Sequence, residues 1–261
     1  MKLKRVMFFL ILYVFIIYIL IAGTYTYSRM IGLFTNSSNH EAPVCTNASC
    51  CQGYIQMSDT NELWNSIRRA IYEYKIRAAV YETIGTIITY ESESINPLYH
   101  SNSGGQTENN EDVWEGAPLP YLRSKISQGD ESRPYFTELV EITRNDFIEA
   151  VTNEYAKVFL DNNKSLEEQI DIISYTEGGS VDVIKIGTLE IKGIDFRKLF
   201  NLNSCKISLE YLEDNIILTV RGNGHGVGMS QWGANYLASQ GYTYQKILKY
   251  YYSGIEIEKM W

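Results

Sequence analysis

The chain is short of basic side chains. Its 261 residues include 23 Lys and Arg against 31 Asp and Glu, a formal net charge of −8. Lys2, Lys4 and Arg5 stand at the extreme N-terminus, so the rest of the chain carries a balance of −11. Proteins that bind nucleic acid neutralise its phosphates with Lys and Arg. This composition therefore argues against a nucleic-acid partner, and equally against a polybasic membrane-surface role.

The chain also lacks internal repeats and a regular alternation of strand and helix. Apolar residues recur at helical spacing in four segments: 59–83, 146–161, 230–239 and 244–252. Short β-like runs occur at 86–90, 94–99, 181–186, 189–191, 206–209 and 216–220. Because these elements are mixed without a βαβ rhythm, the sequence predicts the α+β class, with mixed helices and short strands in one domain.

The first long apolar run predicts a membrane anchor. Val6 to Ala22 is 17 residues long and has no charge, and as a helix it would span roughly 26 Å of a bilayer core of ~30 Å. The basic residues precede it, which favours a cytoplasmic N-terminus. We expect a cytoplasmic tail at 1–5, a single transmembrane helix at 6–23 and an extracytoplasmic domain at 24–261. The alternative is a cleaved secretory signal, for which Ile21-Ala22-Gly23 is a mediocre cleavage site.

Cysteines are few and unevenly placed: all but one of the four lie in the polar loop 34–51. With the nearby histidine they supply the four ligands of a tetrahedral zinc site: His40, Cys45, Cys50 and Cys51. The competing interpretation is a disulfide from Cys45 to Cys50 or Cys51, since exported chains meet oxidising surroundings. Cys205, in a β-rich stretch, is expected to be a buried thiol.

Loop 99–116 combines hydroxyls, amides, carboxylates, an imidazole and an indole. Such groups hydrogen-bond sugar hydroxyls and stack on pyranose faces. The candidate binding residues are His100, Ser101, Ser103, Gly104, Gly105, Thr107, Glu108 and Asp112. A capping loop, whose Ser and Thr satisfy local backbone groups, is the alternative.

Loop 221–233 reads RGNGHGVGMSQWG and surrounds one histidine with glycines. Glycine is used where φ must be positive or where another chain approaches the backbone closely. One histidine supplies too few ligands for a metal site. The functional interpretation is instead that His225 and Gln231 face a cleft. The alternative is a tight turn that only connects a strand to a helix.

These motifs resemble the SpoIID/LytB domain family, named for stage II sporulation protein D. The motifs that carry the resemblance are YHSNSGGQTENNEDVW at 99–114, PYLRSKIS at 120–127, GIDFRKLFNLNSCKISLE at 193–210, GNGHGVGMSQWGA at 222–234 and ILKYYYSGIEI at 247–257. The similarity covers essentially everything after Thr24. It implies a membrane-anchored lytic transglycosylase of the bacterial cell wall, with its C-terminal domain extracytoplasmic.

The resemblance also implies a substrate and partners. The substrate would be peptidoglycan glycan strands that lack stem peptides, degraded during engulfment of the forespore. The partners would be a cell-wall amidase and other engulfment membrane proteins. Loops 99–116 and 221–233 would form the glycan cleft, and the cysteine cluster is similar to a structural zinc site of some family members.

In one respect the sequence departs from the family. A longer region, which holds the catalytic glutamate, normally lies between the anchor and a segment that resembles AQAVAARTYA; here Ala22-Gly23-Thr24-Tyr25-Thr26 matches only the end of that segment. The catalytic residue is therefore unknown. We expect a protein of the lytic transglycosylase type with impaired catalysis, or a non-catalytic glycan-binding or scaffold protein. An enzyme that borrows Glu108, Glu111 or Asp112, and a wrongly bounded coding sequence, are further alternatives.

Overall fold

The computed structural model describes residues 65–261, apart from positions 115, 135, 162, 213 and 214. The chain divides into two compact units, Met1–Ile84 and Gly85–Trp261. In the first, helix α2 (Ser66–Thr83) begins where the Asn65 side chain accepts a hydrogen bond from the Arg68 N–H at 2.9 Å. Within the described residues no helix is long and apolar enough to cross a membrane. The anchor predicted at 6–23 lies outside that part of the chain.

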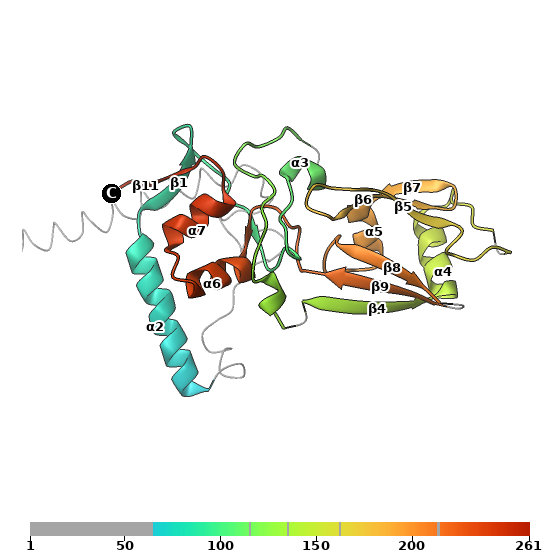
Figure 1. Ribbon diagram of the computed structural model, residues 1–261, viewed down its shortest axis with the longest axis horizontal. Coiled ribbons are helices and arrows are strands. Elements are labelled where there is room, and N and C mark those ends of the chain that lie inside the picture. Colours follow the sequence, from blue (N-terminus) through green and yellow to red (C-terminus); the bar gives the residue numbers. More distant parts are fainter. Residues whose placement is uncertain (1–64, 115, 135, 162, 213–214) are drawn as a thin grey trace, which may run out of the picture. The chain divides into compact units, whose positions relative to one another are not determined.

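The second unit contains all the described strands (Figure 1). Its helices are α3 (Asn110–Val113), the 3₁₀ helix η2 (Asp130–Ser132), α4 (Arg144–Glu154), α5 (Gly193–Leu199), α6 (Gln231–Ser239) and α7 (Tyr244–Tyr251). Its strands are β1 (Thr86–Tyr90), β2 (Glu93–Ser94), β3 (Tyr99–His100), β4 (Thr137–Thr143), β5 (Ile170–Tyr175), β6 (Val181–Ile186), β7 (Leu189–Lys192), β8 (Ile207–Tyr211), β9 (Asn215–Arg221), β10 (Met229–Ser230) and β11 (Glu256–Lys259).

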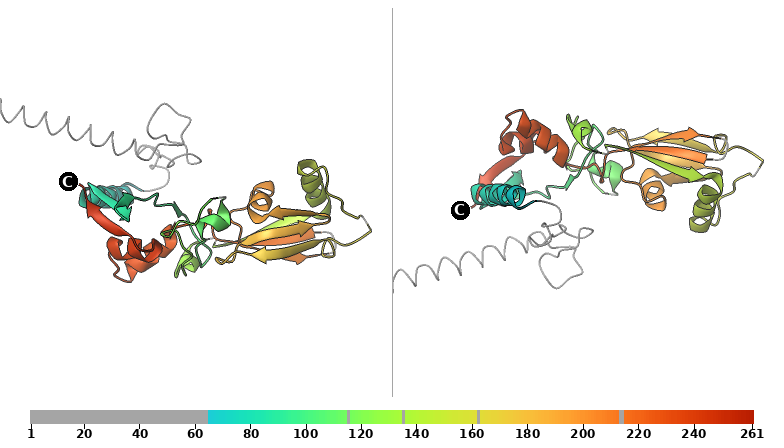
Figure 2. Two further views of the ribbon diagram at one scale, coloured as in Figure 1. Left: turned by 90° about the horizontal axis from the view of Figure 1, so that it is seen from above. Right: turned by 90° about the horizontal axis from the view of Figure 1, so that it is seen from below.

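One hydrophobic core lies among two antiparallel sheets, β4-β9-β8 and β5-β6-β7, and two helices. Helices α4 and α5 lie on the same side of these strands (Figure 2). Phe147 of α4 stacks on Phe200 with ring centroids 5.1 Å apart, and Phe196 of α5 is fully buried beside them. Alternate residues of β9 complete this core because successive side chains of a strand point to opposite faces: Ile216, Leu218 and Val220.

A second core lies under helices α6 and α7 and the small antiparallel sheet β11-β1-β2. Helix α7 begins at Thr243, whose side chain accepts a hydrogen bond from the Lys246 N–H, and it buries Ile247 and Tyr251 four residues apart. Helix α6 begins at Ser230, whose hydroxyl accepts from the Gly233 N–H at 3.2 Å. Between the two cores run the loops of the predicted site.

The α+β class is confirmed, but one predicted helix is too long. The pattern at 146–161 predicts a helix through Asp161, whereas α4 ends at Glu154. Past that point the Phe159 N–H donates to the Thr188 hydroxyl at 3.1 Å, and Phe159 stays 66% exposed. The segment therefore follows the β6–β7 turn instead of continuing the helix. Seven of the described elements have no counterpart in the sequence prediction: α3, η2, β4, β5, α5, β10 and β11.

Candidate functional site

Two loops distant in sequence lie against each other. The backbones of Asn102 and Asn223 exchange both hydrogen bonds, at 3.0 and 2.7 Å, and the Glu108 N–H donates to the Gly226 carbonyl at 2.9 Å. Next to them β3 and β10 form a short parallel pair, with Met229 opposite Tyr99. Backbone pairing therefore joins the two loops that the sequence analysis selected separately.

The glycines of 221–233 are needed for this close approach. Gly226 has φ +81°, and a Cβ there would lie 2.8 Å from Cγ of Glu108. Gly228 has φ +76°, and a Cβ there would collide with the Leu98 carbonyl oxygen. Only glycine combines positive φ with so little space at low energetic cost. Both reasons proposed from sequence for the glycine run hold at these positions.

His225 is held in one tautomer. The Val227 N–H donates to its Nδ1 at 3.1 Å, so Nε2 carries the proton and donates to the Tyr99 carbonyl at 3.1 Å. Burial lowers the pKa of His225, which keeps the ring neutral near pH 7. The Trp114 ring lies against it, with centroids 4.9 Å apart.

His100 lies behind His225, with ring centroids 5.5 Å apart. It is 4% exposed, and its Nδ1 lies 3.1 Å from the Val227 carbonyl, which can only accept. Its Nε2 finds no hydrogen-bond partner within the described part of the chain. Burial, and then the neighbouring His225, lowers the pKa of His100 to about 3. His100 is therefore a neutral, enclosed support for the ring of His225.

A cleft of about 710 Å³ lies beside these loops. Its loop side is formed by Asn109, Glu111, Asp112, Val113, Trp114 and His225. Its sheet side is formed by Tyr175, Thr176, Glu177, Ser180, Val181, Asp182, Lys192, Ile194, Asp195, Lys198 and Cys205. The volume lies within the ~300–1,000 Å³ of typical ligand sites, and the lining is polar apart from Trp114 and a few aliphatic side chains.

Two of the cleft carboxylates are held ionised by cations. Arg123 donates to both oxygens of Glu111, and these hydrogen bonds lower the pKa of Glu111. Lys192 lies 2.8 Å from Asp182 and lowers the pKa of that carboxyl. A general acid that protonates a glycosidic oxygen needs a raised pKa, so neither carboxylate suits that role.

Two other carboxylates share one amide. Nδ2 of Asn109 donates to Asp112 at 2.9 Å and to Glu177 at 2.8 Å. Asn109 and Asp112 belong to the loop side and Glu177 to the sheet side, so this amide connects the two sides of the cleft. Its own carbonyl oxygen accepts from the Ser124 N–H at 2.9 Å, which fixes the orientation of the amide.

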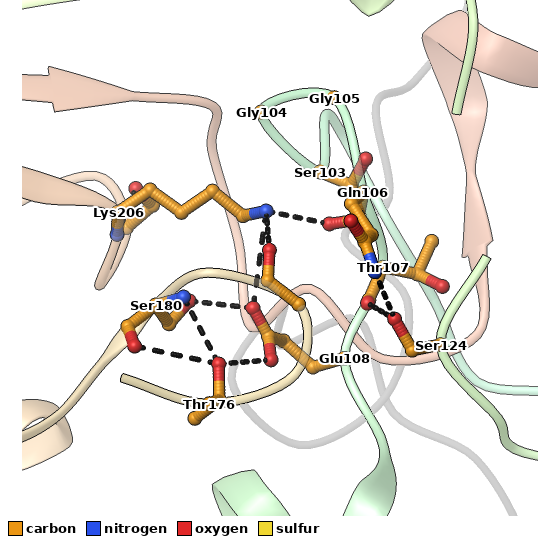
Figure 3. A network of polar contacts seen from close by, with 12 residues as sticks. Ser103, Gly104, Gly105, Gln106, Thr107, Glu108, Ser124, Thr176, Ser180 and Lys206 are labelled. Atoms are coloured by element: carbon orange, nitrogen blue, oxygen red, sulfur yellow. Dashed lines mark hydrogen bonds and ion pairs between the residues drawn. The ribbon is translucent and has the colours of Figure 1, made fainter. Parts of the chain in front are cut away.

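Below the cleft, Glu108 is 1% exposed and enclosed by protein (Figure 3). Thr176 Oγ1 donates to its Oε2 at 2.6 Å and Ser180 Oγ to its Oε1 at 2.7 Å. The Lys206 ammonium lies 3.9 Å from Oε1. Burial lowers the pKa of Lys206, and the Glu108 carboxylate acts in the opposite direction.

Asp130 is a second buried carboxylate, and sequence reasoning missed it. It is fully buried and accepts from the Ser103 N–H at 3.0 Å, the Gly105 N–H at 3.2 Å and the Ser230 hydroxyl at 2.6 Å. Asp130 therefore ties the 103–105 turn to the start of α6. No local pattern in its neighbourhood signals this role, because its partners are 25 to 100 positions away.

No family model matches the chain, but individual proteins do. Stage II sporulation protein D of Bacillus subtilis (strain 168) is 33% identical over 236 residues, which cover 88% of this chain and 65% of that protein. Its namesake from Bacillus amyloliquefaciens is 35% identical over 71% of this chain and 51% of its own length. The chain belongs to the stage II sporulation protein D family.

The amidase enhancer of Bacillus subtilis (strain 168) is also similar, at 25% identity over 67% of this chain and 31% of its own length. The chain spans between about half and two thirds of the two stage II sporulation proteins D.

The ten binding residues that the resemblance to this family implies lie in different surroundings. Asp112 and His225 line the cleft. His100, Ser103, Thr107 and Glu108 are buried, and Ser101, Gly104 and Gly105 are partly exposed without lining the cleft. Gln231 is exposed as the first residue of α6, away from the cleft lining. The sheet side, which includes Tyr175 and Glu177, went unrecognised because β5 was not predicted.

The zinc ligands predicted from the Cys/His loop, His40, Cys45, Cys50 and Cys51, lie outside the described residues. Over residues 65–261, apart from the five gaps, no group of three or more His, Cys, Asp or Glu could hold a metal ion. Cys205 is a free thiol on the sheet side of the cleft, and burial raises its pKa to about 11. It is therefore protonated at neutral pH.

Proposed function

We propose that this chain acts in the sporulation cell wall and that its cleft binds a peptidoglycan glycan strand. The observation that carries the proposal is the lining of the 710 Å³ cleft. In it the adjacent rings of Trp114 and His225 lie beside the Asn109 amide, which donates to both Asp112 and Glu177. An indole offers a flat apolar face of large area, and the neighbouring amide and carboxylates offer partners for sugar hydroxyls. The names of the relatives, a sporulation protein and an amidase enhancer, support a role in the cell wall.

The described cleft supports binding better than acid–base catalysis. A lytic transglycosylase protonates the glycosidic oxygen and deprotonates the C6 hydroxyl of the same sugar, commonly with one carboxyl of raised pKa. The cleft carboxyls of Glu111 and Asp182 have lowered pKa values instead. Lytic transglycosylase chemistry is the second candidate. Asp112 and Glu177 are both exposed carboxylates of the cleft, and Asp112, which belongs to the family motif at 99–114, is the one proposed to carry it.

The test measures binding and products separately. The purified chain is titrated with peptide-free glycan strands by calorimetry, and products are examined for 1,6-anhydro ends by mass spectrometry. Trp114→Ala is expected to weaken binding at least about tenfold, which corresponds to about 1.4 kcal/mol. Trp261→Ala is the matched control, because Trp261 is exposed and packs on Gly85 outside the cleft.

Each outcome of this test decides one point. Equal affinities of Trp114→Ala and the wild type would refute glycan binding at the cleft. Anhydro products that disappear in Asp112→Asn would establish catalysis by that carboxylate. Binding without products would establish that this member of the family binds glycan without cleaving it.

Three further proposals remain. Membrane anchoring through 6–23 follows from the apolar run and zinc from the Cys/His loop. Association with an amidase and other engulfment membrane proteins follows from family membership. Metal analysis of the full chain tests the zinc site. One equivalent of zinc that is lost in Cys45→Ser supports it, and a disulfide between Cys45 and Cys50 or Cys51, seen by peptide mapping, would replace it.

A further inference from the structure

The two sides of the cleft are connected by a few polar contacts beneath it. The turn between β5 and β6, residues 176–180, supplies Thr176, Glu177 and Ser180 to the sheet side. The loop 106–112 supplies Asn109 and Asp112 to the loop side. How far apart these two segments stand decides the width of the cleft at this point.

Glu108 belongs to the loop but makes its side-chain hydrogen bonds with the turn. Its two oxygens accept from the two hydroxyls of that turn, Thr176 Oγ1 at 2.6 Å and Ser180 Oγ at 2.7 Å (Figure 3). Gly178, at the middle of the turn, lies so close to the Glu108 carboxylate that a Cβ there would collide with it. The turn therefore encloses the carboxylate, and the two hydrogen bonds to the carboxylate hold the turn in place.

Lys206, the residue before β8, completes the connection. Its ammonium donates to the Gln106 carbonyl at 2.8 Å and also to the Gly178 carbonyl, one from each segment. It is 6% exposed and lies 3.9 Å from Oε1 of Glu108, so the charges of both side chains are compensated inside the protein. Neither residue lines the cleft.

We propose that Glu108 and Lys206 are positioning residues that fix the 176–180 turn against the 106–112 loop and so set the width of the cleft. The consequence for glycan affinity rests on the proposed function, whereas the fixing of the turn does not. Glu108 then acts on the glycan through Glu177, Thr176 and Ser180, and makes no contact with it.

The test compares two isosteric changes at buried carboxylates. Glu108→Gln removes the charge that holds the turn. Asp130→Asn is the matched control, since Asp130 is equally buried but its partners Ser103, Gly105 and Ser230 lie outside the turn. Amide hydrogen exchange is measured at Gly179 and Ser180, whose N–H groups bond to Thr176 O and Oγ1 at 3.0 Å each, and at Ile184 and Ile186 of β6 as reference.

Glu108→Gln is expected to raise exchange at Gly179 and Ser180 at least tenfold relative to the β6 reference, and Asp130→Asn to leave that ratio unchanged. A uniform change over the chain, or no change in the turn, would overturn the proposal. Should Glu108→Gln fail to fold, Ser180→Ala removes one of the two hydroxyl donors. The same rise in the ratio is expected at Gly179, and an unchanged ratio there is equally decisive against the proposal.

Glycan titration of the same variants separates this proposal from the function on which it draws. Weaker binding by Glu108→Gln than by Asp130→Asn, at a temperature where both are folded, supports both. A loosened turn with no glycan binding by any protein, wild type included, would remove the glycan function and leave the positioning role in place. A turn unchanged in Glu108→Gln would remove the positioning role even where Trp114→Ala abolishes binding.

Discussion

Glu108 of loop 99–116 and Asp130 of η2 are both buried carboxylates that bond to neighbouring segments, but they are stabilised differently. Glu108 has a buried cation 3.9 Å away and accepts from two hydroxyls. Asp130 accepts from backbone N–H groups and the hydroxyls of Ser103 and Ser230. The difference shows that this fold uses a charge pair where the segments of the two cores meet, and neutral donors where one loop meets the start of α6.

The largest expected effect comes from removing the cation. Lys206→Met leaves Glu108 buried without its charge partner, and breaking a buried pair in this way costs about 3–5 kcal/mol of the free energy of unfolding. The measurement is urea unfolding followed by circular dichroism. The double variant Glu108→Gln/Lys206→Met should recover much of the loss, and a double variant as unstable as the sum of both single changes would refute the charge pairing.

Asp130→Asn should have a smaller effect, because no buried cation is left behind. Asparagine keeps one acceptor oxygen but places an amide NH₂ where Asp130 accepts from a hydroxyl or N–H, and losing hydrogen bonds to a charged group costs about 1.5–3 kcal/mol. The same unfolding experiment measures it. A loss greater than that of Lys206→Met would contradict the comparison.

His100 is a third buried titratable group, and its effect on stability depends on pH. Its pKa in the folded protein is about 3, below the ordinary 6.5, so the unfolded chain takes up the proton first as pH falls. Stability is therefore lost as pH falls from 6.5 toward 3, by about 2 kcal/mol at pH 5. His100→Gln should remove this part of the pH dependence between pH 7 and 5. An unchanged slope would show that the imidazole titrates normally.

The smallest effect is expected at an exposed pair. Lys192 and Asp182 lie 2.8 Å apart, closer than Lys206 and Glu108, but Lys192 is 63% exposed. Exposed pairs contribute about 0.2–1 kcal/mol, so Lys192→Met should change the free energy of unfolding by less than 1 kcal/mol. A change as large as that of Lys206→Met would mean that distance, not burial, decides the energy of an ion pair here.

The sequence predicted regular elements best where the side chains carry a strong local pattern. The alternation in β9 and the repeated apolar positions of α7 are visible in the sequence and appear in the structure. Strand β4 was missed although its residues alternate in burial. It lies at the edge of its sheet, and its apolar Leu139 points to the exposed face, 69% exposed, so the sequence does not alternate cleanly between apolar and polar residues. Helix α4 was predicted too long: it ends at Glu154, and beyond it the Phe159 N–H bonds to Thr188, a residue distant in sequence that no local pattern reveals.

By itself the sequence determined the class of the fold, the family, and the two loops that meet, because glycine positions and long motifs are local properties of the chain. The tertiary structure decided what each polar side chain of those loops does. Glu108 and Asp112 are four positions apart in one motif, yet Glu108 is enclosed by the β5–β6 turn and Asp112 lines the cleft. The physical reason is that burial and charge compensation depend on residues such as Thr176, Ser180 and Lys206, which reach Glu108 only when the chain is folded.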